Sequence, residues 1–154
     1  MECRFLRTLF AAAILMAAIP FQASAAPVNA CSVVTRADVG SAVGHGAVTP
    51  GKKMKQYAGD PTSVCQYDTE AGNVVVTFDP TNHNQFFSSY KAGYASSLQS
   101  ISGIGDAAIY YRQHGTLIIR KGQSVLMLTL DSPDDQRDRT ILFALGRHVT
   151  PRIH

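Results

Sequence analysis

The feature that most constrains this chain is a pair of cysteines, Cys31 and Cys65, that follows an apolar N-terminal leader. The third cysteine, Cys3, lies inside the leader. Such leaders are removed during export, and an even number of cysteines in an exported chain indicates disulfide bonding. We therefore predict a Cys31–Cys65 disulfide that pins the N-terminal half of the fold. The chain-entropy model assigns about 3–4 kcal/mol to closing a loop of this length.

The leader has the three parts of an export signal. Basic residues come first, an apolar run follows, and Ala23-Ser24-Ala25 has the small-x-small pattern that signal peptidase needs. We place the cut after Ala25, so residues 1–25 form the signal peptide and residues 26–154 form one periplasmic or secreted domain. The apolar run is too short for a permanent membrane span, and no later stretch predicts one.

A lipid anchor is the alternative use of the first cysteine. Val28-Asn29-Ala30-Cys31 resembles a lipoprotein box, in which the cysteine is acylated. Acylation of Cys31 would leave Cys65 as an odd free thiol, which is unusual in an exported protein. The disulfide is therefore the prediction that we prefer.

The charge of the chain is only mildly basic. A net charge of +3 at pH 7 does not indicate a nucleic-acid-binding protein. The one tight basic cluster, Lys52, Lys53 and Lys55, lies between turn residues and predicts a solvated hairpin or loop. Its alternative role is contact with an anionic surface or partner.

Hydrophobic spacing and turn residues predict an α+β fold. The expected order is a helix, two or three strands, a helix, three strands and a helix, with an antiparallel sheet of about six strands flanked by helices. The strand at residues 124–131 is apolar on both sides and should be central. The other predicted elements are helices that begin at Thr35, at about Asn82 and after Ser132, and strands at 64–69, 74–79, 107–112 and 116–120, with a further weak strand between 47 and 59.

Two groups of aromatic residues could face a core or a ligand. Tyr110 and Tyr111 are adjacent on one predicted strand and must face opposite sides, so we expect at most one in the core and the other on a surface. The central helix, expected to reach Gln99, carries one apolar stripe at helical spacing, which predicts core packing and alternatively a ligand platform. The stripe consists of Phe86, Tyr90, Tyr94 and Leu98.

The last helix has clear boundary signals. Ser132 is the predicted N-cap and Pro133 the first helical residue, followed by acidic residues in the first turn. Gly146 is expected to fray the helix early, and Pro151 to end it.

Several short motifs match catalytic or binding patterns without their required context. Residues 103–108 match G-x-G-x-x-A, but a helix precedes them and a strand follows, so a tight turn capped by Asp106 is predicted. Residues 88–91 match S-x-x-K without its partner motifs. The acidic run at 131–138 lacks the calcium-loop pattern, and the histidines do not cluster. No catalytic residue, metal site or cofactor is predicted.

Four motifs follow one another along the mature chain: Cys31-Ser32-Val33-Val34-Thr35 with Asp38-Val39, Cys65-Gln66-Tyr67, Gly103 to Ala108, and Gly115 to Gly122. Their order resembles a group of small exported and lipoprotein domains of unknown function. The resemblance covers nearly the whole mature chain and implies a PsbP/Mog1-like α/β sandwich with a binding or accessory role outside the cytoplasm. It supplies no catalytic residues.

Three functions are compatible with these features. The first is a non-catalytic domain that binds an envelope protein or a small ligand across its sheet or sheet edge, through Lys52, Lys53, Lys55, Tyr110 or Tyr111. The second is a small enzyme whose site gathers His83, Asp106 and His114. The third is an inhibitor of an envelope enzyme that acts through an exposed loop at Thr49–Pro61.

Overall fold

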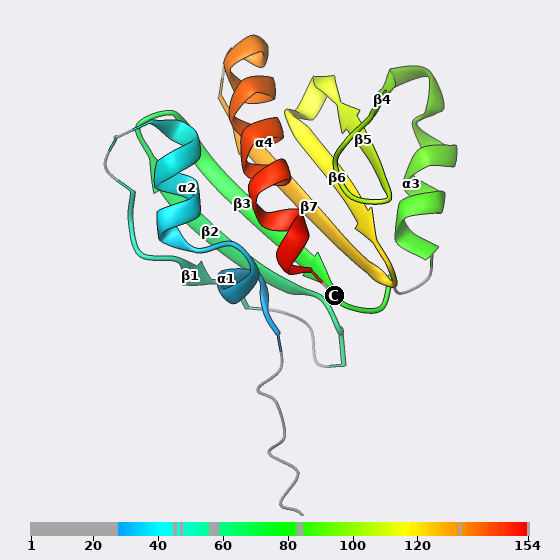
Figure 1. Ribbon diagram of the computed structural model, residues 1–154, viewed down its shortest axis with the longest axis horizontal. Helices are drawn as coiled ribbons and strands as arrows, with labels where there is room; N and C mark the ends of the chain where they lie inside the picture. The colour runs from blue at the N-terminus through cyan, green and yellow to red at the C-terminus, as the bar shows by residue number, and fades with distance from the viewer. Residues whose placement is uncertain are drawn as a thin grey trace, which may run out of the picture.

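The computed structural model describes residues 28–44, 46, 48–55, 59–82, 85–132 and 134–153. The predicted signal peptide and its cut after Ala25 lie outside these residues. In the described part, helices flank one antiparallel sheet (Figure 1). The α+β prediction is therefore confirmed.

The sheet has seven strands rather than about six. Its order is β1-β2-β3-β7-β6-β5-β4, and β7 is the central strand, as its two apolar sides predict. Two meanders, β1 to β3 and β4 to β7, meet at the β3–β7 pair, where Val75 lies opposite Thr129. The strands are β1 (Lys52–Lys53), β2 (Ser63–Thr69), β3 (Gly72–Asp79), β4 (Leu98–Ile101), β5 (Ala107–Tyr111), β6 (Thr116–Lys121) and β7 (Ser124–Asp131).

The helices cover the two faces of the sheet unequally. The face covered by α1, α2 and α4 is called the helical face, and the face that α3 partly covers is called the open face. In Figure 1, α2 and α4 lie in front of the sheet and α3 lies at its right. The helices are α1 (Ala30–Val33), α2 (Arg36–Val43), α3 (Phe86–Gly93) and α4 (Asp135–Val149).

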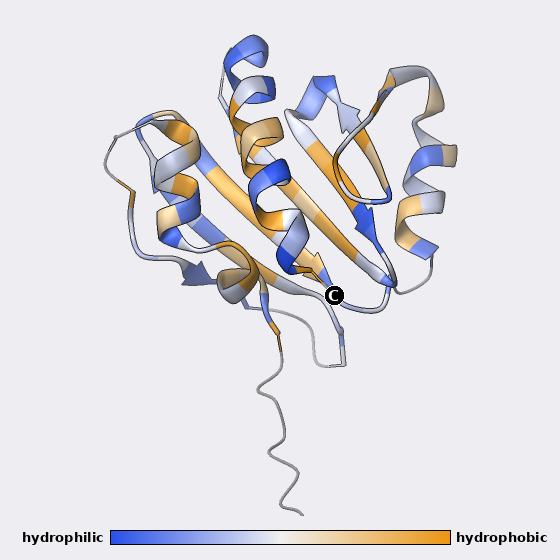
Figure 2. Ribbon diagram, viewed as in Figure 1, coloured by the Kyte–Doolittle hydropathy of each residue, from blue (hydrophilic) through white to orange (hydrophobic). Residues whose placement is uncertain are grey.

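The main core lies on the helical face. Alternate residues of β3 and β7 are fully buried beneath α4, for example Val76 and Leu128, and Figure 2 shows hydrophobic bands along β3, β6 and β7. Ile104, in the turn before β5, also packs into this core. A smaller core lies on the open face, where Phe87 of α3 covers Ile109 and Ile118.

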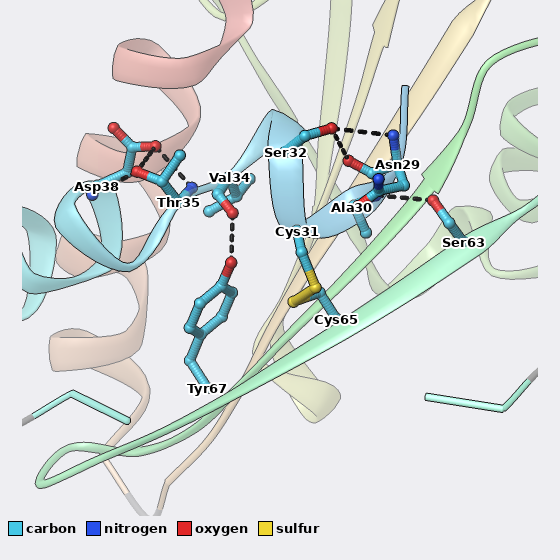
Figure 3. The surroundings of a disulfide bond; sticks show 10 residues. All are labelled: Asn29, Ala30, Cys31, Ser32, Val34, Thr35, Asp38, Ser63, Cys65 and Tyr67. Atoms are coloured by element: carbon cyan, nitrogen blue, oxygen red, sulfur yellow. Dashed lines mark hydrogen bonds between the residues drawn. A yellow bond between two sulfur atoms is a disulfide. The ribbon is translucent and has the colours of Figure 1, made fainter. Parts of the chain in front are cut away.

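The predicted disulfide is confirmed. Cys31 of α1 is bonded to Cys65 of β2, with 5.2 Å between their Cα atoms (Figure 3). The backbone N–H of Ala30 also donates to Ser63 Oγ at 2.8 Å. The sulfur of Cys31 is thus occupied, so this structure is not that of the lipid-anchored alternative.

The first long helix begins where predicted. The backbone N–H and hydroxyl of Thr35 both donate to Asp38 Oδ2 at 2.7 Å, which makes a capping box. Arg152 Nη2 also donates to Asp38 Oδ2 at 2.7 Å, and His148 Nε2 lies 3.1 Å from Asp38 Oδ1. The buried Asp38 carboxylate therefore joins the start of α2 to the C-terminal end of α4.

The prediction that the central helix reaches Gln99 is wrong. α3 ends at Gly93, a 3₁₀ turn covers Ala95–Ser97, and residues 98–101 form the edge strand β4. Leu98 pairs with Tyr111 and Ile101 with Ala108. Glycine weakens a helix at this point, and pairing with β5 provides strand hydrogen bonds that a continued helix would lose.

The predicted start of the last helix is also wrong. Its N-cap is Asp134, whose Oδ1 accepts from the N–H groups of Gln136 and Arg137 at 3.1 Å, and Pro133 lies outside the described residues. The Ser132 hydroxyl instead donates to Asp138 Oδ1 at 2.5 Å. A carboxylate accepts two amide donors at once, which explains why the aspartate displaces the serine.

Gly146 does not fray α4, which continues to Val149. A Cβ atom on Gly146 would lie 2.9 Å from Leu117 Cδ2 and 3.0 Å from Ile119 Cδ1. The glycine is therefore explained by close packing of α4 on β6 rather than by helix termination.

Candidate groove on the open face

A depression of about 970 Å³ lies on the open face, between α3 and the C-terminal end of β7. Its floor is formed by alternate residues of three neighbouring strands, its wall by aromatic rings of α3 and β5, and its rim by charged residues around the start of α4. We call this depression the groove.

The floor of the groove follows from strand register. Val75, Thr129 and Thr116 lie side by side on β3, β7 and β6, and the hydroxyl oxygens of the two threonines are 3.1 Å apart. Met127, two residues before Thr129, completes the floor. These side chains are mixed in polarity, which suits a surface that is only partly covered.

The wall is a cluster of three tyrosines and one histidine. Ring centroids are 4.8 Å apart for Tyr90 and Tyr94, 5.1 Å for Tyr94 and Tyr111, and 4.8 Å for Tyr111 and His114. Tyr94 is 45% exposed, whereas Tyr111 is 6% exposed. Burial raises the pKa of Tyr90, and its tyrosine neighbours add to the rise. In the wall, Tyr94 and His114 are therefore exposed, Tyr90 is half-buried and Tyr111 is buried behind them.

The interpretation of the α3 stripe as core is only partly correct. Phe86, Tyr90 and Leu98 are half-buried against the smaller core, but Tyr94 is exposed. The core-facing residue of α3 is Phe87, which the predicted stripe does not include. The short helix covers β5 and β6 and leaves the wall open toward β3.

The rim carries more acidic than basic groups. Arg112 Nε forms an ion pair with Asp135 Oδ2 at 2.8 Å. Asp138 accepts a hydrogen bond from Ser132, and Asp131 is exposed at the end of β7. Burial raises the pKa of Asp138, and the nearby Asp134 and Asp135 carboxylates add to the rise against the lowering effect of the Ser132 hydrogen bond. Negative charge is therefore crowded at this end of the groove.

One glycine sets the position of the wall relative to the rim. Gly115 follows the 3₁₀ turn Arg112–His114 with a φ of 49°, in the left-handed region. A Cβ there would lie 2.5 Å from the carbonyl oxygen of Leu130 and 3.0 Å from Asp138 Oδ2. The turn therefore approaches β7 closely enough to place Arg112 and His114 beside the groove.

A second depression, of about 580 Å³, continues the groove toward the other end of β7. The two share Phe86 and Met127, and the second is also lined by Asp60 and Asp79, each of which has hydrogen-bonding partners. The open face thus carries one elongated channel that runs along β7.

The two adjacent tyrosines on β5 face opposite sides, as predicted, but both are buried. Tyr110 packs edge-on against Phe143 of α4, and its hydroxyl donates to Asp135 Oδ1 at 2.9 Å. Burial raises the pKa of Tyr110, and the Asp135 hydrogen bond adds to the rise. Tyr110 belongs to the main core, whereas Tyr111 belongs to neither core cluster, so the expectation of at most one core tyrosine agrees with the structure. Tyr111 lines the groove, and Tyr110 does not.

The predicted lysine cluster lies away from the groove. Lys52 and Lys53 form the edge strand β1 and pair with Gln66 and Cys65, and Lys55 follows just beyond it. All three are exposed. β2 and β3 separate β1 from β7, so the cluster and the groove are distinct surfaces.

The enzyme alternative required His83, Asp106 and His114 to meet. Asp106 accepts from the Gly122 N–H at 2.7 Å and from Lys121 Nζ at 3.0 Å, at the start of β5. His114 follows the far end of β5, about 16 Å away for a strand of this length, so the two cannot exchange a proton directly. His83 lies outside the described residues.

A long exposed loop at Thr49–Pro61 would favour the inhibitor alternative. Part of that segment is instead attached to β2, because β1 lies in it, the Thr49 N–H donates to the Asp68 carbonyl, and the Met54 N–H donates to the Val64 carbonyl. Residues 56–58 lie outside the described part of the chain. The weak strand predicted here is confirmed as β1.

The described residues contain no group of three or more histidine, cysteine, aspartate or glutamate side chains that could hold a metal ion. No helix in the described ranges is long and apolar enough to cross a bilayer.

Sequence reasoning missed the residues that give the groove its chemistry. The spacing of Tyr94 predicts core packing and only alternatively a ligand platform, and Asp135 is predicted to lie at a helix N-terminus. No pattern predicts Asp131 or Arg112 as a site residue. A usable signal was the acidic run at 131–138 beside an aromatic strand, but only the β5–β7 arrangement brings the two together. No protein-family model, curated protein or solved structure matches the chain.

Proposed function

We propose that this chain is an exported, non-catalytic binding domain that holds a ligand or partner in the groove on the open face. The observation that carries the proposal is the exposed ring of Tyr94, set in a cluster of tyrosines beside a concave, mixed-polarity floor. Concave sites that combine aromatic surface with a few convergent polar groups are the usual binding sites of proteins.

The contacts among the groove residues support binding rather than catalysis. Arg112 is held by Asp135, Asp138 accepts from Ser132, and the His114 ring packs on Tyr111. These contacts fix the shape of the wall and rim. Acid–base catalysis needs a proton donor or acceptor aimed at a reacting group, and these side chains are aimed at one another.

The compartment and the fold family belong to the same proposal. The Cys31–Cys65 disulfide is compatible with an oxidising location, which supports a periplasmic or secreted protein. The antiparallel sheet with helices on both sides supports the PsbP/Mog1-like sandwich that the motif order implies. Accessory binding roles fit both features.

The test compares capture of a partner from the native envelope by immobilised variants. We expect Tyr94→Ala to retain less than about one tenth of the material that the wild-type protein retains, because truncating an anchoring aromatic side chain costs about 2 kcal/mol or more of binding free energy. Lys52→Ala, in the edge strand β1 away from the groove, should retain the same amount of material as the wild-type protein. Quantitative mass spectrometry of the eluates gives the ratios.

Two results would contradict the proposal. Loss of capture by Lys52→Ala but not by Tyr94→Ala would move the interaction to the β1 edge. Turnover of an envelope substrate that disappears in His114→Ala, with folding intact, would show that the groove is catalytic.

A further inference from the structure

The charge of the groove is opposite to that of the chain. The whole sequence carries +3 at pH 7, yet three carboxylates line the groove against one guanidinium among its described lining residues. Asp135 is paired with Arg112, Asp138 is buried, and Asp131 is exposed. Among the described residues that line it, the continuation of the groove adds Asp60 and Asp79, both of which are hydrogen-bonded, and no lysine or arginine. A concave surface of one sign concentrates ligands of the other sign. The occupant should therefore be cationic.

The aromatic wall offers a second, independent contact for a cation. The face of a tyrosine ring attracts a guanidinium or ammonium group within about 6 Å of the ring centroid. This chain already uses such contacts, because the Arg139 guanidinium lies 5.8 Å from the Tyr110 ring and 5.5 Å from the Phe143 ring. Tyr94 is the wall tyrosine whose ring is substantially exposed.

The shape of the groove favours a chain segment over a small molecule. Pockets for small molecules bury most of their ligand, whereas this depression is open along its length. It continues past Phe86 and Met127 into the second depression. From Asp131 on β7 to Asp79 on β3, which pairs with Val125, the two depressions together extend about 20 Å at the usual rise of a strand. That length matches about six residues of extended polypeptide.

We infer that the groove binds an extended segment of a partner polypeptide that carries arginine or lysine, with one cationic side chain placed against Tyr94 and beside Asp131. The inference rests on the proposed function and names the class of its ligand. The remainder of the segment would lie over Met127 toward the second depression.

The test uses a fluorescein-labelled hexapeptide of alternating threonine and arginine, which favours an extended conformation. Its matched control has citrulline in place of arginine, which keeps the shape and removes the charge. By fluorescence anisotropy, the arginine peptide should bind the disulfide-bonded protein at least about tenfold more tightly than the citrulline peptide. Binding should weaken as salt is raised from 50 to 300 mM, where the Debye length is shorter.

Matched variants locate the binding. Asp131→Asn and Tyr94→Ala should each weaken the arginine peptide by about fivefold or more. Asp68→Asn, an equal charge change at an exposed site of β2 outside the groove, should leave the affinity unchanged. Backbone amide NMR spectra check that each variant is folded and show whether the peptide shifts residues that line the groove.

Each contrary result overturns a stated part of the inference. Equal affinity for the two peptides would show that the ligand need not be cationic. An equal loss of peptide affinity in Asp131→Asn and Asp68→Asn would show that the peptide does not bind in the groove. If N-acetylarginine amide binds as tightly as the hexapeptide, the groove takes a small cation rather than a chain. If Tyr94→Ala loses the envelope partner while Asp131→Asn keeps it, this inference fails and the proposed function survives.

Discussion

The two faces of the sheet are built from the same strands but differ in how they are completed. On the helical face, Leu128 is fully buried under α4, and a disulfide and the Asp38 carboxylate tie the covering helices down. On the open face, its neighbour Met127 is only half-buried, and α3 covers part of the surface. The difference indicates that stability resides mainly in one face and leaves the other available for contact with a partner.

The largest expected effect tests this division within a single strand. Leu128→Ala should lower the free energy of unfolding by about 3–5 kcal/mol, because it opens a cavity in a close-packed core. Met127→Ala, one residue away on the open face, should cost about 1–2 kcal/mol, since the side chain is already partly in water. Urea unfolding followed by circular dichroism measures both. Equal losses would show that the faces contribute equally.

The second effect concerns the disulfide. Replacing both Cys31 and Cys65 by serine should cost about 3–4 kcal/mol, because the unfolded chain regains the entropy that the crosslink removes. The folded double variant should still bind the arginine hexapeptide as the wild type does, since the crosslink joins elements of the helical face. A loss of unfolding free energy below about 1 kcal/mol, or weaker binding of the arginine hexapeptide, would contradict the separate roles of the two faces.

A smaller, pH-dependent effect is expected at Asp38. Burial raises the pKa of its carboxyl, but hydrogen bonds from Arg152 and Thr35 outweigh this and hold the pKa below its usual value of 3.8. The carboxylate therefore stabilises the fold above about pH 4, and this contribution is lost as the pH falls through the lowered pKa. At pH 7, Asp38→Asn should cost about 2 kcal/mol.

Unfolding free energies of both proteins between pH 7 and pH 2 check this prediction. The difference between wild type and Asp38→Asn should stay constant down to about pH 4 and shrink below it. Asp68→Asn, at an exposed site, is the control and should change stability by less than about 0.5 kcal/mol. A difference that disappears between pH 8 and pH 5 would point to another group.

Local patterns predicted the parts of the fold that depend on neighbouring residues. The capping box at Thr35 and Asp38, the central position of residues 124–131 and the disulfide followed from residue type and spacing. The predictions that failed depended on distant contacts. The sequence predicts Gly146 as a helix breaker, but its close packing on β6 explains the glycine instead. The sequence predicts Leu98 as a helix residue, but it pairs with Tyr111 in the sheet.

The groove was harder to predict for the same reason. Its residues come from β3, α3, β5, β6, β7 and α4. The strands β5 to β7 follow one another in the sequence, but β3 reaches the groove only through its pairing with β7. Tyr94 matched the periodicity of a core residue, and only the shortness of α3 leaves it exposed. A surface that forms where a covering helix stops short has no local pattern.

The Cys31–Cys65 bond also changes what a cut in the backbone would do. The exposed Lys52–Lys55 stretch, a natural substrate for trypsin-like proteases, lies inside the loop that the bond closes. Hydrolysis there would leave both fragments covalently joined, with α1 still attached to β2. A nicked molecule would therefore keep its mass, apart from the added water, until the disulfide is reduced, and its sheet would lose only the β1 edge.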